Sequence, residues 1–172
     1  MARVNKKKRK WWIYLLVLLV VIQFIRPERN VATAALNADK NITAVYEVPQ
    51  PVRDILKTSC NDCHSNTTIY PWYTNVQPVG WWLQWHVNEG KQHLNFDEFG
   101  SSSLRRQYHQ LEETADQVNH DEMPLSSYLI IHKDAALSAA QKDQLIQWTQ
   151  SIRKSMENKY PMDSLQRPQS GR

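Results

Sequence analysis

Glycine is scarce in this chain, with only four among 172 residues. Tight β-turns use glycine for backbone angles that other residues avoid, so its scarcity disfavours a turn-rich β architecture and favours helices. The sequence also shows no internal repeat, and its length corresponds to about one domain. We therefore expect an all-α fold.

Acidic residues are absent before Glu28, whereas six of the 21 Lys and Arg residues precede residue 11. The remaining 15 basic and 17 acidic residues leave a net charge of −2 for the rest of the chain. The pI near 9.1 is thus set by a short N-terminal run. Because no basic stripe alternates with aromatic residues, we expect no nucleic-acid partner.

Residues 11–25 form an apolar run that only Gln23 interrupts. As a helix this run would extend about 22 Å, slightly less than the ~30 Å hydrocarbon core of a bilayer. Trp11, Trp12 and Tyr14 stand where interfacial aromatic residues are typical, and the preceding basic residues favour the cytoplasm. The sequence therefore predicts a single-pass transmembrane anchor over residues 11–25, with residues 1–10 cytoplasmic.

A cleaved signal peptide is the alternative, since residues 32–34 read Ala-Thr-Ala and resemble a cleavage site. Arg26, Glu28 and Arg29 lie before this site, where such regions are usually uncharged and short. We therefore expect an uncleaved anchor. Both interpretations place the chain from about residue 30 onward outside the cytoplasm.

The rest of the chain divides into three parts. Residues 26–48 are rich in Asn, Ala, Thr and Asp without a clear period, and we interpret them as a linker. Pro49 and Pro51 mark the start of a predicted domain over residues 49–157. Pro161 prevents further helix, so residues 158–172 are expected to form a disordered tail.

Apolar residues at helical spacing predict four helices in this domain. The first leads into Cys60, the second follows Pro78, the third is capped by one of the serines 101–103, and the fourth begins with the capping box of Ser138 and Gln141. The predicted buried faces are, in order, Val52, Ile55 and Leu56; Val79, Trp82, Leu83, His86 and Val87; Leu104, Tyr108, Leu111, Ala115 and Val118; and Leu145, Trp148, Ile152 and Met156.

The only two cysteines lie in the stretch Cys60-Asn61-Asp62-Cys63-His64. This C-x-x-C-H pattern is that of covalent c-type haem attachment. Two thiols at this spacing add to the two vinyl groups of one haem, and the adjacent imidazole reaches the iron. The sequence therefore predicts one covalent haem c bound through Cys60 and Cys63, with His64 as the proximal iron ligand.

Two other interpretations of the cysteine pair are weaker. A thioredoxin-like redox pair would need βαβ patterning around the motif, which is absent. A structural zinc site would need four ligands, usually with a second closely spaced pair, and none is visible.

Met123 is the predicted distal iron ligand. It lies in a polar loop 59 positions after His64 and directly before Pro124. A thioether opposite an imidazole is a known haem ligation that raises the reduction potential. His86 is the main rival, although a histidine on an apolar helix face is more often a packed core residue. Weaker rivals are His93, His109, His120 and His132. Four tryptophans could line the haem pocket or fill the core: Trp72, Trp81, Trp82 and Trp85.

The motif and four other segments resemble the bacterial haem-binding domain family related to class I cytochromes c, over about residues 48–155. These segments are Tyr70-Pro71-Trp72-Tyr73, Val87-Asn88-Glu89-Gly90, Leu94-Asn95-Phe96 and Met123-Pro124. The resemblance implies that the motif ends an N-terminal helix, that a Met-Pro loop supplies the second ligand, and that a C-terminal helix packs across the first. It also implies haem attachment at the outer, periplasmic face of the bacterial inner membrane.

These observations predict an all-α, cytochrome c-like helical domain with one N-terminal transmembrane helix. The expected function is that of a membrane-anchored monohaem c-type cytochrome that transfers single electrons outside the cytoplasm to an unidentified redox partner, without enzymatic activity. A haem-based peroxidase-like enzyme or a small-ligand sensor is the alternative if the sixth iron position is open or labile, although no catalytic acid–base pair is visible. A haem-bearing assembly or anchoring subunit is a third possibility.

Overall fold

The computed structural model describes residues 6–31 and 38–166, and all regular structure in these ranges is helical. The one exception is an isolated β-bridge between Val31 and Thr67. The all-α prediction is therefore confirmed for the described residues. The elements are, in chain order, α1 Lys6–Ile22, η1 Ala38–Lys40, α2 Ile42–Val45, α3 Gln50–Ser59, α4 Asn61–His64, η2 Trp72–Asn75, α5 Val79–His93, η3 Phe96–Ser101, α6 Leu104–Asn119, α7 Ser126–Leu129, η4 Lys133–Ala135, α8 Ala139–Lys159 and α9 Met162–Leu165, where η marks a 3₁₀ helix.

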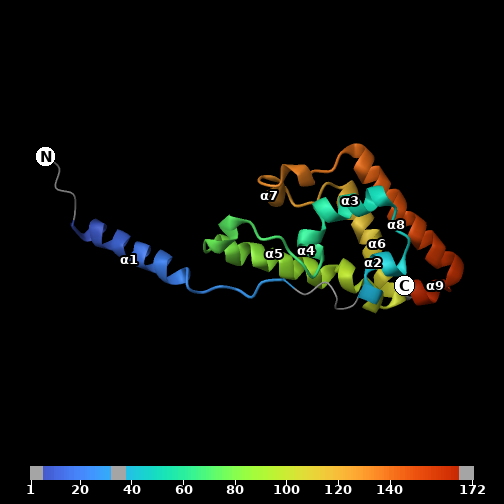
Figure 1. The fold of residues 1–172 in the computed structure, drawn as a ribbon, viewed down its shortest axis with the longest axis horizontal. Helices are drawn as coiled ribbons and strands as arrows, with labels where there is room; N and C mark the ends of the chain where they lie inside the picture. Colours follow the sequence, from blue (N-terminus) through green and yellow to red (C-terminus); the bar gives the residue numbers. More distant parts are fainter. Residues whose placement is uncertain (1–5, 32–37, 167–172) are drawn as a thin grey trace, which may run out of the picture.

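The core lies where α3 and α6 pack against the long helix α8 (Figure 1). The predicted buried faces of these helices are confirmed with one exception, since Leu104 only packs at the edge of the core. The predicted caps are also present: Ser103 Oγ accepts a hydrogen bond from the Arg106 amide, and Ser138 and Gln141 form a complete capping box. Each fully buried aliphatic side chain contributes about 1.5–3 kcal/mol to folding. Apolar period and capping residues were thus sufficient to predict these helices.

The predicted buried face of α5 is wrong. Of its five predicted residues only Val87 is buried, whereas Val79 and Trp82 are 41% and 49% exposed. The buried side instead carries Gly80, Gln84 and Val87. Gln84 tolerates burial because its carboxamide oxygen accepts a hydrogen bond from the Tyr70 hydroxyl, which satisfies a polar group that hydropathy alone assigns to the surface.

The predicted transmembrane helix requires a correction. In the part of the chain that the structure describes, no helix combines the length and the apolar character needed to cross a membrane. Helix α1 ends at Ile22, and the first five of its 17 residues are basic. The remaining stretch spans about 18 Å, well short of the ~30 Å hydrocarbon core. The single-pass inner-membrane location derived from this helix is corrected with it. The cleavage site considered at residues 32–34 lies outside the described residues.

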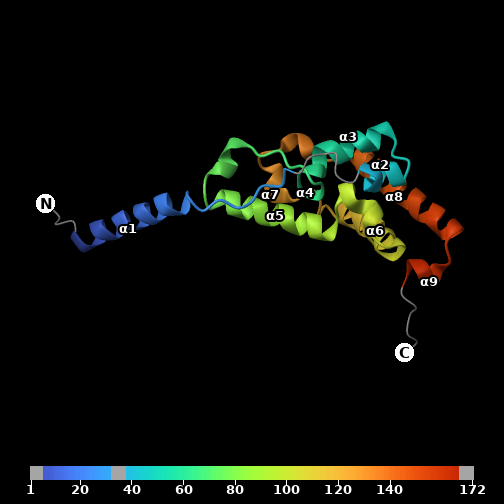
Figure 2. The same cartoon turned by 60° about the horizontal axis from the view of Figure 1, so that its bottom comes forward.

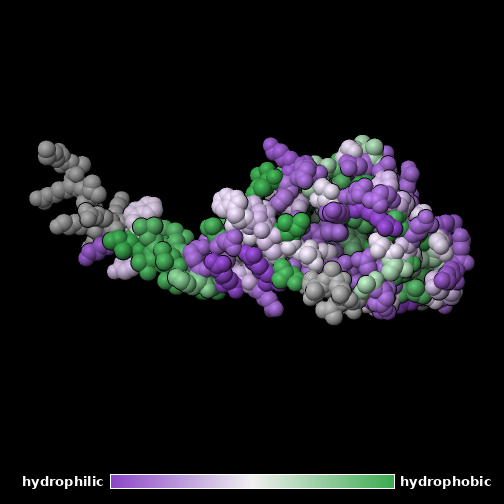
Figure 3. All heavy atoms as spheres, viewed as in Figure 1, coloured by the Kyte–Doolittle hydropathy of each residue, from purple (hydrophilic) through white to green (hydrophobic). Residues whose placement is uncertain are grey.

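Helix α1, with exposed apolar side chains, extends away from the helical domain (Figures 1 and 3). The chain that follows it runs alongside α5 in both ribbon views (Figure 2). We call residues 23–31 the docked segment, because its contacts with the domain are specific. The Gln23 carboxamide exchanges two hydrogen bonds with the backbone of Gln77, at 2.8 and 3.1 Å. Asn30 donates to the Ser65 carbonyl and to the Thr68 hydroxyl, both at 2.9 Å. Residues 26–31 of the predicted linker are therefore attached to the domain, together with Gln23 from the end of the predicted anchor.

The domain also extends beyond both predicted boundaries. Ile42 and Val48, each 2% exposed, belong to the core although they precede residue 49. After α8, the short helix α9 buries Leu165 to 1% exposure. The predicted tail is thus structured as far as residue 166, and residues 167–172 lie outside the described residues.

Candidate functional site

The C-x-x-C-H motif occupies one helical turn between two helices. Cys60 is the C-cap residue of α3 and the N-cap residue of α4. Its carbonyl accepts hydrogen bonds from the amides of Cys63 and His64 at 3.1 and 3.0 Å. This turn fixes the spacing of the two sulfurs and the imidazole. The two thiols are free, without a disulfide bond between them.

Both thiols are held in their protonated form. Burial, with a smaller contribution from Cys63, raises the pKa of Cys60 to about 12. Burial and the Asp62 carboxylate raise the pKa of Cys63 to about 11. Reactive redox cysteines have lowered pKa values, because the thiolate is the attacking form. This environment therefore argues against a thioredoxin-like pair.

His64 has the protonation state that an iron ligand requires. Its Nδ1 lies 3.0 Å from the carbonyl oxygen of Leu94. Since a carbonyl only accepts, Nδ1 carries the proton and Nε2 keeps its lone pair. Burial lowers the pKa of His64, although hydrogen bonds to the carbonyls of Leu94 and Gly90 oppose this shift. The imidazole is thus neutral at pH 7, oriented by a backbone carbonyl in the way that metal-ligating histidines usually are.

Helix α5 approaches the motif closely because it carries glycine at position 90. A β-carbon added to Gly90 would lie 2.7 Å from the carbonyl oxygen of Cys63. The Phe96 ring meets the imidazole of His64 edge-on, with centroids 6.2 Å apart. The sequence argument from residue spacing did not assign these contacts. Their signal lay in the Val87–Gly90 and Leu94–Phe96 segments that carried the resemblance.

A second group of side chains connects the motif to the segment after α6. The Tyr128 hydroxyl in α7 donates a 2.7 Å hydrogen bond to Asp62, which stands between the two cysteines. The ring of Tyr128 stacks on His132 at 4.1 Å, and His132 lies 3.4 Å from the Tyr73 hydroxyl. Burial and then the Asp62 contact raise the pKa of Tyr128, which remains a hydrogen-bond donor at pH 7. Sequence analysis missed Asp62 and Tyr128, which are 66 positions apart.

Met123 belongs to this same segment, which we call the Met123 arm (residues 120–132). Its amide donates to the carbonyl of Gln117 at the end of α6, at 3.2 Å. Its side chain is half-buried and packs against the core. Tyr128, five positions later, donates its hydrogen bond to Asp62 of the motif. The structure therefore links the arm of the predicted distal ligand to the motif of the proximal one.

The rival histidines have other partners. His86 lies between Trp82 and Trp85, with ring centroids 4.3 and 4.7 Å away, and its Nδ1 bonds to the Trp82 carbonyl. It is only partly buried, so it is no core histidine. His93 and His109 lie near glutamates of their own helices, and His120 bonds to the carbonyl of Asp116.

Several apolar side chains on the loop after the motif, on η2, on α5 and on the Met123 arm are exposed. They are Ile69, Trp72, Val79, Trp82, Ile130 and Ile131. Of the four tryptophans considered for the pocket or core, Trp81 is half-buried and donates to the carbonyl of Ile25, whereas Trp72, Trp82 and Trp85 are exposed. A bound apolar macrocycle would cover part of such a surface and gain free energy from the area removed from water.

The donor set fits a haem better than a bare metal ion. Within the described residues, no group of three His, Cys, Asp or Glu side chains could hold a metal ion. A porphyrin brings four nitrogen ligands of its own and needs only axial ligands from the protein. One neutral imidazole beside two thiols in a single turn meets this need.

A family model described as a haem-binding domain matches residues 17–151, which is well over half of the chain. No curated protein and no solved structure matches the chain. The matched residues include the C-x-x-C-H motif, the whole docked segment and the Met123 arm.

Proposed function

The chain belongs to the haem-binding domain family, and we propose that it binds its haem as a single haem c and serves as a one-electron carrier. In this proposal Cys60 and Cys63 form the two thioether bonds, and His64 is the proximal iron ligand. The single observation that carries it is the α4 turn, which holds two half-buried thiols and an imidazole whose Nε2 has no hydrogen-bond partner among the described residues, all within five consecutive residues.

Met123 is proposed as the distal ligand. Its loop is tied at one end to α6 by a backbone hydrogen bond and at the other to Asp62 through Tyr128. A loop fixed at both ends can keep a weak thioether ligand at the iron, because little conformational entropy of the loop is lost when the sulfur binds. The haem supplies an iron that gains or loses one electron, and two axial ligands leave no open position for substrate.

The arrangement of helices supports a relation to class I cytochromes c. Helix α3 ends at the motif, and the long helix α8 packs against α3. The resemblance implied both features. Electrons would be exchanged with a redox partner through exposed apolar side chains such as Trp72 and Trp82.

An optical experiment on the full chain, produced with a c-type maturation system, tests the proposed ligands. The wild-type haem is expected to be low-spin in both oxidation states, and Met123→Ala is expected to become high-spin or to bind added imidazole. Met162→Ala is the matched control, since Met162 is 46% exposed in α9 outside the arm. A high-spin wild type would favour a sensor or peroxidase-like protein with an open sixth position. An unchanged Met123→Ala spectrum would reject Met123 and direct attention to His86.

A further inference from the structure

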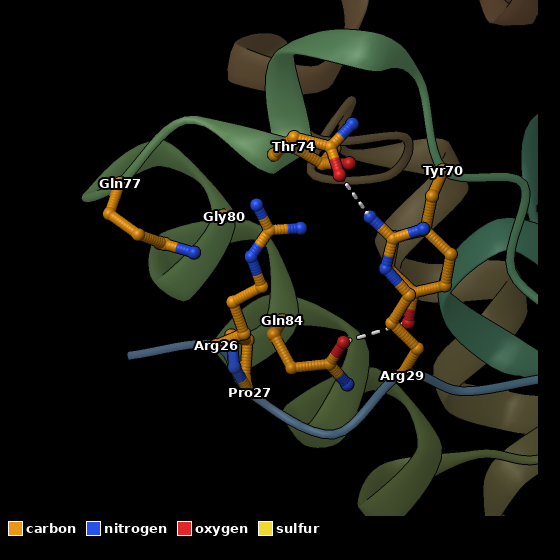
Figure 4. A pocket seen from close by; sticks show the side chains of 9 residues that line it. Arg26, Pro27, Arg29, Tyr70, Thr74, Gln77, Gly80 and Gln84 are labelled. Carbon is orange, nitrogen blue, oxygen red and sulfur yellow. Dashed lines mark hydrogen bonds between the residues drawn. The ribbon is translucent and has the colours of Figure 1, made fainter. Parts of the chain in front are cut away.

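A pocket lies where the docked segment crosses the start of α5 (Figure 4). The space between its lining side chains, counted out into the solvent at its open side, is about 290 Å³. The docked segment contributes Arg26 and Arg29, and the domain contributes polar side chains that include Tyr70, Asn75 and Gln77. The haem proposal uses none of these groups.

The charge of this pocket is positive and is not balanced from within. Among the described residues, no carboxylate lines it. Arg29 is held by neutral partners, because its guanidinium donates to the Asn75 carboxamide at 2.6 Å and lies 4.9 Å from the centre of the Tyr70 ring. Arg26 has no hydrogen-bond or ion-pair partner among the described residues. Figure 4 shows both guanidinium groups reaching into the pocket from the docked segment.

Gln77 adds a donor with a fixed orientation. The residue is only 3% exposed, and its side-chain oxygen accepts a hydrogen bond from the Trp81 amide at 3.0 Å. This bond fixes which carboxamide atom is the oxygen, so the other atom, Nε2, remains available as a hydrogen-bond donor. Nε2 has no partner among the described residues, and Figure 4 shows it directed towards the guanidinium of Arg26. Arg26 and Arg29 are exposed residues, and an anion seated between these converging donors would accept hydrogen bonds from them.

We propose that this pocket binds a small dianionic oxyanion of the phosphate class between Arg26, Arg29 and Gln77. Guanidinium groups form charge-assisted, often paired hydrogen bonds with phosphate oxygens. Two of them match the two negative charges of phosphate near neutral pH. Because Arg26 and Arg29 belong to the docked segment and Gln77 to the domain, the bound anion would also strengthen the attachment of this segment to α5.

The test is isothermal titration calorimetry of the full, haem-loaded chain with inorganic phosphate, against sodium chloride at matched ionic strength. We expect saturable phosphate binding in the wild type and a loss of about tenfold or more in affinity in Arg26→Gln, as one charge-assisted hydrogen bond is removed. Lys57→Gln is the control, since it removes the same charge from an exposed position of α3 outside the pocket. The Arg26 guanidinium has no hydrogen-bond or ion-pair partner among the described residues, so its variant should keep the wild-type haem spectrum.

Three outcomes would overturn the proposal: no phosphate binding beyond the chloride control, equal affinity in Arg26→Gln and wild type, or equal losses in Arg26→Gln and Lys57→Gln. The first would mean that the pocket holds water only. Glycerol phosphate in a second titration distinguishes a phosphate ester from the free ion, since only a ligand that fits the open side of the pocket with its ester group would bind with similar affinity. None of these readouts depends on the iron ligands, so they test the pocket separately from the haem proposal.

Discussion

Removing the Tyr128 hydroxyl is the sharpest perturbation of the proposed distal side. The variant Tyr128→Phe keeps the ring that stacks on His132 and deletes only the 2.7 Å hydrogen bond to Asp62. Hydrogen bonds to charged groups contribute about 1.5–3 kcal/mol, and partial exposure to solvent favours the lower end of this range. A loss of about 1.4 kcal/mol corresponds to a tenfold shift in an equilibrium. We therefore expect the arm to leave the motif about ten times more often.

The assay is the binding of imidazole to the oxidised haem, because imidazole binds only when Met123 leaves the iron. In Tyr128→Phe the apparent affinity for imidazole should rise about tenfold, in line with the population of the open arm. The control is Tyr46→Phe, which deletes a 2.8 Å hydrogen bond to Gln107 between α2 and α6. It should lower the melting temperature without changing imidazole binding. Equal imidazole affinities in wild type and Tyr128→Phe would refute the argument that Asp62 and Tyr128 hold the Met123 arm.

Three further predictions concern the fold around the site. Gly90→Ala places a β-carbon 2.7 Å from the Cys63 carbonyl, so it should destabilise the chain by about 1–3 kcal/mol in urea unfolding, and an unchanged midpoint would contradict the close packing of α5 on the motif. Ser138→Ala breaks the capping box of α8 and should cost about 1 kcal/mol, whereas Ser101→Ala, in an exposed position without a capping role, should cost little in the same measurement. The hydrogen bond from Tyr108 lowers the pKa of Glu157 below its ordinary value of 4.5, so this bond stabilises the fold above pH 4.5 and its contribution is lost as the pH falls through the lowered pKa. In Tyr108→Phe the free energy of unfolding should therefore fall less steeply with decreasing pH in this range. An identical acid slope in both proteins would exclude a contribution of this hydrogen bond to stability.

The helices that the sequence predicted well share one property, which is that local signals and burial agree. In α3 and α8 the apolar spacing coincides with the side that packs into the core, and α8 also has its capping box. In α5 they disagree, because the helix buries Gly80 and Gln84 and leaves Trp82 exposed. Which side of a helix faces the domain is decided by its neighbours, and hydropathy does not encode them.

The candidate site divides in the same way. Cys60, Cys63 and His64 were visible because their chemistry depends on neighbours in the sequence. The proton on His64 Nδ1 is set by the carbonyl of Leu94, 30 positions away, and the arm is held by Tyr128, which is 66 positions from Asp62. No period or motif reports a pairing at such separations. The docked segment was missed for the same reason, since Gln23 and Gln77 are 54 positions apart.

The central claim is that Cys60 and Cys63 attach one haem covalently, and mass spectrometry of the denatured full chain tests it most directly. After production with a c-type maturation system, the wild type should carry the mass of one haem per chain. The double variant Cys60→Ala, Cys63→Ala should have the mass of the polypeptide alone. A denatured wild-type chain without the added mass of a haem, although haem was bound before denaturation, would contradict the account.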